Sequence, residues 1–131
     1  MTEKLELYKC NVCGNLVQVI LPGEGELVCC GEPMELLNPQ TEEEGKTEKH
    51  VPVFIKQNEN EEIIQVGSIP HPMEESHYIM FIEAISDDKN RLELKYLYPQ
   101  EESKMFIKEG GERVCALEYC NLHGLWEGKS D

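Results

Sequence analysis

Four cysteines in the first quarter of the chain have the type and spacing of metal ligands. Cys10 and Cys13 form a Cys-x-x-Cys pair, and Cys29 and Cys30 are adjacent to each other. Two thiolates from one tight turn reach the same ion, and a second pair from a distant turn completes a tetrahedron. Because four thiolates suit zinc and iron alike, the spacing predicts a tetrahedral site without fixing its metal.

Two interpretations of these cysteines that involve no metal are weaker. A thioredoxin-like redox pair at Cys10 and Cys13 requires a βαβ context, which the surrounding sequence lacks. A disulfide between Cys29 and Cys30 would close a strained ring. The adjacent pair is also unusual for a zinc knuckle, which normally repeats the two-residue spacing, so a simple zinc ribbon is disfavoured.

A second group contains every histidine of the chain and one cysteine near the C-terminus. Its members are His50, His71, His77, Cys120 and His123. Each histidine alone is weak evidence, because a lone histidine is more often a surface or hydrogen-bonded core residue. These, however, lie at the ends of expected strands, where a rigid scaffold presents functional groups. Five nitrogen and sulfur donors exceed the four that zinc prefers and therefore favour iron.

This second ligand set predicts redox chemistry. Four imidazoles in a plane with one axial thiolate leave a sixth position open for a small molecule. The thiolate opposite pushes electron density toward that position, as in thiolate-ligated haem enzymes. Such a site donates one electron to an oxygen species. Blue copper is the weaker alternative, because its axial methionine follows the cysteine in sequence, whereas all five methionines here precede Cys120.

Short β-strands are the elements expected to position both groups. In the N-terminal segment the run 16–20 predicts a strand and residues 22–25 predict a turn. A unit this small needs a metal or a partner surface for stability. Residues 38–47 are polar and include three consecutive glutamates, which predicts a solvated linker. We expect a small metal-binding domain over 1–37, a linker over 38–47 and a second domain over 48–131.

The second domain is predicted to be a β-sandwich. Strand-like runs cover residues 51–55, 63–66, 78–82, 92–98, 105–107 and 114–117. In the fourth run Leu92, Leu94, Tyr96 and Tyr98 recur at every second position, as a half-buried antiparallel strand requires. Short strands separated by turns, with no long amphipathic helix, predict an all-β fold of the sandwich type.

Charge and composition limit the partners and the compartment. The 131 residues include 26 acidic and 12 basic ones, for a formal net charge of -14. Such a surface repels phosphate backbones and anionic lipids, so we expect no nucleic-acid partner and no membrane partner. The sequence shows no signal-peptide pattern and no apolar run of membrane-spanning length. With its six cysteines grouped as ligands rather than disulfides, the protein is expected in the cytoplasm.

Taken together, these residues resemble the desulfoferrodoxin family, the two-iron form of superoxide reductase. The four N-terminal cysteines resemble a desulforedoxin-like iron centre. The stretches 48–52, 71–73, 77–78 and 118–124 resemble the motifs around the catalytic iron of that family. The resemblance covers nearly the whole chain, and the motifs are far more specific together than singly.

The resemblance implies two iron ions and no organic cofactor. A desulforedoxin-like domain would hold an Fe(Cys)4 centre, and an immunoglobulin-like β-sandwich would hold a square-pyramidal Fe(His)4(Cys) centre with Cys120 as axial ligand. The implied activity is superoxide reductase, the one-electron reduction of superoxide to hydrogen peroxide without oxygen release. It would detoxify superoxide in an anaerobe or microaerophile. A rubredoxin-type electron donor and a homodimer are implied as well.

The resemblance also places Lys49 and Glu48 beside the open face of the catalytic iron. Superoxide is an anion, and the protein is strongly negative, so a local cation is needed to focus it. Lys49 is the candidate, and it would also help order a water that delivers a proton. Glu48 resembles the carboxylate that helps displace the product. The alternative for both is an ordinary exposed ion pair.

Three residues near the second group are not assigned as metal ligands. Two interpretations remain for Glu118: its side chain forms hydrogen bonds behind the ligands, or it occupies an ordinary exposed position. Cys115 is expected to be a small buried apolar residue, and Trp126 to be core packing. Two other functions remain as alternatives for the whole chain. One is an electron-transfer protein with two metal centres and no substrate, and the other is a zinc-stabilised interaction module.

Overall fold

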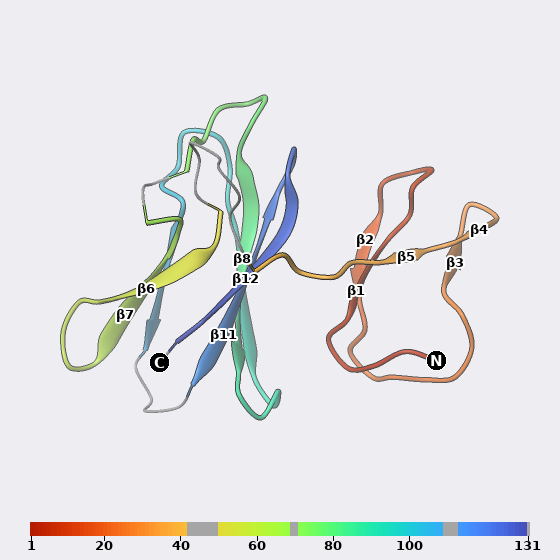
Figure 1. Cartoon of the computed structure of the whole chain (residues 1–131), viewed down its shortest axis with the longest axis horizontal. Coiled ribbons are helices and arrows are strands. Elements are labelled where there is room, and N and C mark those ends of the chain that lie inside the picture. The colour runs from red at the N-terminus through yellow and green to blue at the C-terminus, as the bar shows by residue number, and fades with distance from the viewer. Residues whose placement is uncertain (42–49, 69–70, 109–112, 131) are drawn as a thin grey trace. The chain divides into compact units, whose positions relative to one another are not determined.

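The computed structural model describes residues 1–41, 50–68, 71–108 and 113–130 (Figure 1). Within these ranges all regular structure is β-strand and no helix occurs, which confirms the predicted all-β class. The chain divides into two compact units, Met1–Asn38 and Pro39–Asp131. The predicted boundaries of the linker stay predictions, because residues 42–49 lie outside the described ranges.

The first unit is built from very short strands. A three-stranded antiparallel sheet has the order β2-β1-β5, and a separate hairpin joins β3 to β4. The strands are β1 (Leu7–Lys9), β2 (Leu16–Gln18), β3 (Val28–Cys29), β4 (Glu32–Pro33) and β5 (Glu35–Leu36). Of these, the sequence predicted the strand at β2 but neither β1 nor β5, which are too short to show an alternating pattern.

The first unit has a small apolar core. Its buried apolar residues are Leu5, Leu7, Cys10 and Val19. More of its large apolar side chains are exposed: Met1, Val12, Val17, Ile20, Leu21, Val28 and Leu36. Apolar burial of this extent does not stabilise a unit of this size, so the expectation that its cysteines bind a metal agrees with its packing.

The second unit is a sandwich of two antiparallel sheets, as predicted. One sheet has the order β10-β7-β6 and the other has the order β12-β11-β8-β9 (Figure 1). The strands are β6 (Pro52–Lys56), β7 (Glu61–Val66), β8 (Ile79–Ser86), β9 (Leu92–Tyr96), β10 (Lys104–Lys108), β11 (Val114–Cys120) and β12 (Gly124–Lys129).

The core of the sandwich lies between these two sheets and extends to the metal-binding residues. It consists of Ile64, Val66, Ile79, Ile82, Ala84, Leu97, Met105, Ile107, Ala116 and Cys120. Cys120, at the end of β11, is therefore both a member of the core and a candidate ligand. A thiolate held this way lies on a rigid element, which is what a well-defined metal geometry requires.

Strand β9 is more exposed than the sequence predicted. Its alternation is real, but Leu92, Leu94 and Tyr96 are 38, 37 and 66% exposed, and Tyr98 lies beyond the strand at 62%. The expectation of a half-buried face is wrong for the single chain. The physical reason is that Leu92, Leu94 and Tyr96 lie on the outer face of their sheet. The core residues Ile82 and Ala84 of β8 lie opposite Lys95 and Glu93 instead. Among the described strands, β9 is also an edge strand, paired with β8.

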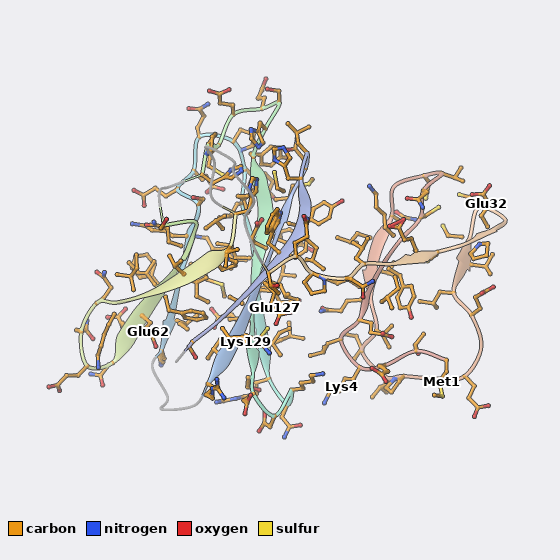
Figure 2. All side chains as sticks on the ribbon, viewed as in Figure 1. Met1, Lys4, Glu32, Glu62, Glu127 and Lys129 are labelled. Atoms are coloured by element: carbon orange, nitrogen blue, oxygen red, sulfur yellow. The ribbon has the colours of Figure 1, made fainter. Side chains whose placement is uncertain are left out.

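Strand β12 was not predicted at all. It pairs with β11 over its whole length, from Cys120 opposite Gly124 to Cys115 opposite Lys129. The glycines at both of its ends and its mixed burial hide the alternation on which a sequence prediction depends. On β12 the Nζ of Lys129 lies 3.6 Å from an oxygen of Glu127 (Figure 2).

Candidate metal centres

Cys10 and Cys13 lie in the turn that connects β1 to β2. The N–H of Gly14 donates to the carbonyl of Cys10 at 2.9 Å, and the N–H of Cys10 donates to the carbonyl of Asn15 at 2.9 Å. Gly14 has a φ of 85°, a left-handed conformation that glycine adopts without strain. The turn therefore folds tightly enough to bring both thiols to one side.

The adjacent cysteines reach the same place through a hairpin turn. Cys29 ends β3 and pairs with Glu32 of β4, so Cys30 and Gly31 form a two-residue loop. Both loop residues have positive φ, 52° and 77°, which is the requirement of a type I′ turn. This geometry explains how two consecutive cysteines belong to one site despite their unusual spacing.

The four sulfurs lie within 4.8 Å of one another. The Sγ atoms of Cys13 and Cys29 are 3.6 Å apart, and those of Cys29 and Cys30 are 3.9 Å apart. All six cysteines of the chain are free thiols, so the predicted absence of a Cys29–Cys30 disulfide agrees with the structure.

The pKa values of Cys10 and Cys30 are shifted in opposite directions. The backbone N–H of Cys13, 3.4 Å from the sulfur, lowers the pKa of Cys10 to about 6. Hydrogen bonding to Cys13 and then to Cys29 raises the pKa of Cys30 to about 12. Four thiolates this close repel one another without a cation among them. A divalent or trivalent metal ion removes that conflict, so the donor set fits a tetrathiolate metal centre.

The second group gathers at one end of the sandwich from four separate segments. His50 precedes β6, His71 precedes the loop that ends at His77, and His77 precedes β8. Cys120 ends β11, and His123 closes the loop that leads into β12. The pairing of β11 with β8 shifts between Tyr119 and Cys120, an irregularity of the kind that re-aims a side chain.

The potential ligand atoms of this group also lie within 4.8 Å of one another. The Nε2 of His50 lies 3.0 Å from the Nε2 of His71 and 3.0 Å from the Nδ1 of His123. The Sγ of Cys120 lies 3.8 Å from the Nε2 of His71 and 3.9 Å from the Nδ1 of His123. Imidazole nitrogens and a thiolate that converge in this way are arranged as ligands of one ion.

The five residues of this group differ in burial. His50, His71 and Cys120 are 0, 4 and 0% exposed, whereas His77 and His123 are partly exposed. His77 and His123 therefore form the more exposed side of the group. The thiol of Cys120 lies in the apolar core.

Hydrogen bonds fix the two loops that carry these ligands to each other. The side chain of Asn121 accepts from the N–H of Tyr78 at 3.0 Å and donates to the carbonyl of Ser76 at 3.1 Å. The backbone N–H of Asn121 donates to the carbonyl of Tyr78 at 3.2 Å. Asn121 thus connects the loop of Cys120 and His123 to the segment of His77. Sequence reasoning did not single it out, although it lies between two predicted ligands.

A second support comes from the segment that sequence reasoning assigned to the linker. Gln40 bridges Trp126 of β12, and its Nε2 donates to the carbonyl of His123 at 2.8 Å. The indole N–H of Trp126 donates to the same carbonyl at 3.1 Å. No sequence signal identifies Gln40, because its partner is 83 residues away.

Three further predicted residues have different outcomes. Lys49 and Glu48 lie outside the described residues, so their roles stay predictions. Glu118 is 0% exposed and lies opposite Trp126 on β12, so it is not a plain exposed residue.

Cys115 is half-buried rather than buried, which corrects the expectation that it is a core residue. Burial and then the charge of Glu127 raise the pKa of Cys115 to about 11. Because the thiolate is the nucleophile and the metal ligand, this thiol is unreactive near neutral pH.

Comparison with known proteins agrees with this geometry. The desulfoferrodoxin family matches residues 42–129, and the desulfoferrodoxin N-terminal domain matches residues 2–37. The chain belongs to the desulfoferrodoxin family. A desulfoferrodoxin homologue of Archaeoglobus fulgidus is 50% identical over 97% of this chain and 98% of its own length.

Solved structures extend the likeness of this desulfoferrodoxin to superoxide reductases. The superoxide reductase of Treponema pallidum has a TM-score of 0.73 and 25% identity, covering 95% of this chain and 98% of its own. The one-iron superoxide reductase of Giardia intestinalis has a TM-score of 0.54 and 30% identity, covering 65% of this chain and 99% of its own. The Giardia intestinalis protein is thus matched over almost its whole length.

The family and the two donor sets agree on the metal. Five mixed nitrogen and sulfur donors exceed a zinc tetrahedron, and four thiolates accept iron, so both sets fit iron. The predicted complement of two iron ions per chain is supported.

Within the described residues, no helix is both long and apolar enough to cross a membrane.

Proposed function

We propose that this desulfoferrodoxin is a superoxide reductase. The reaction takes one superoxide, one electron and two protons to one hydrogen peroxide. The observation that carries the proposal is the convergence of four imidazoles on the buried thiol of Cys120, in a fold shared with superoxide reductases. Iron held by these five residues would supply the electron that superoxide takes up.

Each ligand has a role that follows from its position. His50, His71, His77 and His123 would supply four nitrogens, and Cys120 would supply a thiolate from the core side. A thiolate ligand would supply electron density to the bound metal. The partly exposed His77 and His123 border the side from which a small anion arrives.

Lys49 and Glu48 would serve the approach of substrate and the departure of product. A chain with a net charge of -14 repels superoxide at long range, so a cation directly before His50 focuses the anion where it is needed. Lys49 would also orient a water that delivers a proton. The carboxylate of Glu48 would help displace the product.

The test of this proposal is the reaction of the reduced protein with superoxide, followed by bleaching of superoxide absorbance. We expect the wild type to remove superoxide faster than spontaneous dismutation. We expect Lys49→Ala to slow the encounter roughly tenfold and to weaken its dependence on ionic strength. An unchanged rate in Lys49→Ala, with wild-type iron content, would remove Lys49 from the mechanism.

The four-cysteine centre would hold the second iron, and a rubredoxin-type protein would supply electrons. The exposed positions of Cys13 and Cys30 support exchange with an external donor, because electron transfer requires close approach. The six free thiols support a reducing compartment, so we place the protein in the cytoplasm. We assign no nucleic-acid or membrane partner to this acidic surface.

A homodimer formed through β9 is part of the proposal. This edge strand offers unpaired backbone groups along one side and the exposed side chains of Leu92, Leu94 and Tyr96. Antiparallel pairing of β9 with its own copy satisfies two-fold symmetry, because each copy presents the same edge. The side chains of Leu92, Leu94 and Tyr96 would then lie beside those of the second copy along the joined edge.

A further inference from the structure

Trp126 contacts two of the four histidines in different ways. Its indole is stacked on the imidazole of His50, with ring centroids 4.9 Å apart and 17° between the planes. Its N–H donates to the backbone carbonyl of His123 at 3.1 Å. The side chain is 2% exposed, so both contacts are shielded from water.

The stacking is specific to this pair of rings. The imidazoles of His71 and His123 meet His50 edge-on, at 65° and 80° to its plane. Within the described residues, only the indole of Trp126 lies nearly parallel to His50. A flat ring against a flat ring fixes the plane of the imidazole, and hence the direction in which its nitrogen points.

The hydrogen bond to His123 is one of two on the same carbonyl. Gln40 donates to it at 2.8 Å, and Trp126 donates to it at 3.1 Å. Both donors come from the segment and strand that pair at the Gln40 to Trp126 bridge. Together they hold the backbone of His123 at the point where the loop enters β12.

We infer that Trp126 is a positioning residue that orients His50 and His123 and lowers the reduction potential of the metal they bind. This inference rests on the proposed function, because it assumes that both imidazoles are ligands. An imidazole bound to a more highly charged ion carries more positive charge on its ring. The electron-rich face of an indole attracts such charge, most strongly in a dry environment. The stacked Trp126 therefore favours the oxidised state over the reduced one.

The first experiment measures the midpoint potential of the iron-loaded protein by redox titration, following the thiolate-to-iron absorption. We expect Trp126→Leu, which removes the stacked ring, to raise the midpoint potential by roughly 30 to 59 mV. This corresponds to about a threefold to tenfold increase in the equilibrium constant for one-electron reduction. Trp126→Phe keeps a ring that stacks, so its potential should stay closer to that of the wild type. The absorption of the four-cysteine centre is an internal control.

The second experiment separates the hydrogen bond from the stacking. Trp126→Phe leaves Gln40 as a donor to the carbonyl of His123, whereas adding Gln40→Ala to that variant removes both donors. We expect the double variant to release iron from the five-ligand site to a chelator at least tenfold faster than Trp126→Phe does. This comparison carries the test if Trp126→Leu does not fold.

A matched control is Tyr119→Leu. Tyr119 is next to Cys120 in sequence, but its ring is stacked on Phe81, 6.0 Å between centroids, and not on a histidine. Its loss should leave the potential unchanged. The inference is overturned if iron-loaded Trp126→Leu keeps the wild-type potential, or if the double variant releases iron no faster than Trp126→Phe.

The two proposals fail separately. Neither the potential nor the rate of iron release requires superoxide. A shifted potential in Trp126→Leu, combined with a wild type that forms no peroxide from superoxide, would support the role of Trp126 and reject the proposed function. An unshifted potential with normal peroxide formation would do the reverse.

Discussion

At the scale of single residues, Cys120 unites the packing of the sandwich with the chemistry of the site. It belongs to the apolar core, yet its sulfur lies within 4 Å of nitrogens of His71 and His123. An uncompensated negative charge is costly to bury in such surroundings, so a thiolate there requires a cation beside it. The metal ion and the folded core therefore depend on each other at this residue.

Replacing this sulfur by oxygen tests its assignment. We expect Cys120→Ser to abolish the thiolate-to-iron absorption of the oxidised five-ligand site, because that band requires an iron–sulfur bond. The spectrum of the four-cysteine centre should be unchanged, since its ligands lie in the other unit. Absorption spectra of both proteins at equal iron content give the answer. Persistence of both bands would show that Cys120 is not the axial ligand.

The candidate metal ligands could be predicted from the sequence, whereas the residues that hold those ligands in place could not. The nine candidate ligands follow from the spacing of cysteine and histidine, and the structure brings them together in two groups. Trp126 was predicted to pack in the core, and it is buried. Its contacts with His50 and His123 were not predicted, because they depend on how the strands pair. Gln40 gave no signal, because its role depends on a partner far away in the sequence.

At the scale of elements, β6 and β12 approach each other closely at the edges of the two sheets. A Cβ on Gly128 of β12 would overlap the backbone carbonyl of Pro52, the first residue of β6. His50 directly precedes β6, and Trp126 lies on β12, so this approach also holds His50 against the indole. A glycine at this position allows the two edges to meet.

We expect Gly128→Ala to destabilise the protein by about 1–3 kcal/mol, because the added methyl group must push the strands apart. Urea or thermal denaturation of the iron-loaded protein measures the change. Gly23→Ala is the control, since a Cβ there would meet nothing within 4 Å and its φ is not positive. Equal stability of Gly128→Ala and the wild type would contradict the close approach.

Strands with a clear alternation were predictable, whereas short or glycine-bounded strands were not. The runs that became β6, β7, β8, β9, β10 and β11 were found from β-branched and aromatic residues. Strand β12 was missed because glycines interrupt it, and β1 and β5 because two or three residues show no period. The exposed face of β9 could not be anticipated, since alternation reports the strand and not its place in the sheet.

At the scale of the whole molecule, the exposed edge strand β9 is the surface through which we propose that two chains form a dimer. We expect Tyr96→Asp to shift the sedimentation of the protein from dimer to monomer, because a carboxylate facing its copy repels it. Ile55→Asp is the matched control, since Ile55 is 39% exposed on β6, in the other sheet. A monomeric wild type, or a Tyr96→Asp variant that remains dimeric, would reject this interface.

The strongly acidic chain carries two candidate iron sites, one in each of its two units. Family membership covers both units, and the one-iron relative from Giardia intestinalis aligns with about two thirds of the chain. We therefore propose that the reaction with superoxide occurs at the site of Cys120 and its four histidines, and that the four-cysteine centre is an addition to it. The products formed from superoxide distinguish this account from simple electron transfer and from dismutation.

The most direct test is product stoichiometry after mixing anaerobically reduced protein with a known pulse of superoxide, with peroxide and oxygen both measured. We predict one peroxide per superoxide and no oxygen, with one electron lost from the protein for each superoxide consumed. Half a peroxide and half an oxygen per superoxide, sustained without an electron donor, would contradict the account and establish a dismutase. No acceleration over the spontaneous reaction, with both irons present, would contradict it as well.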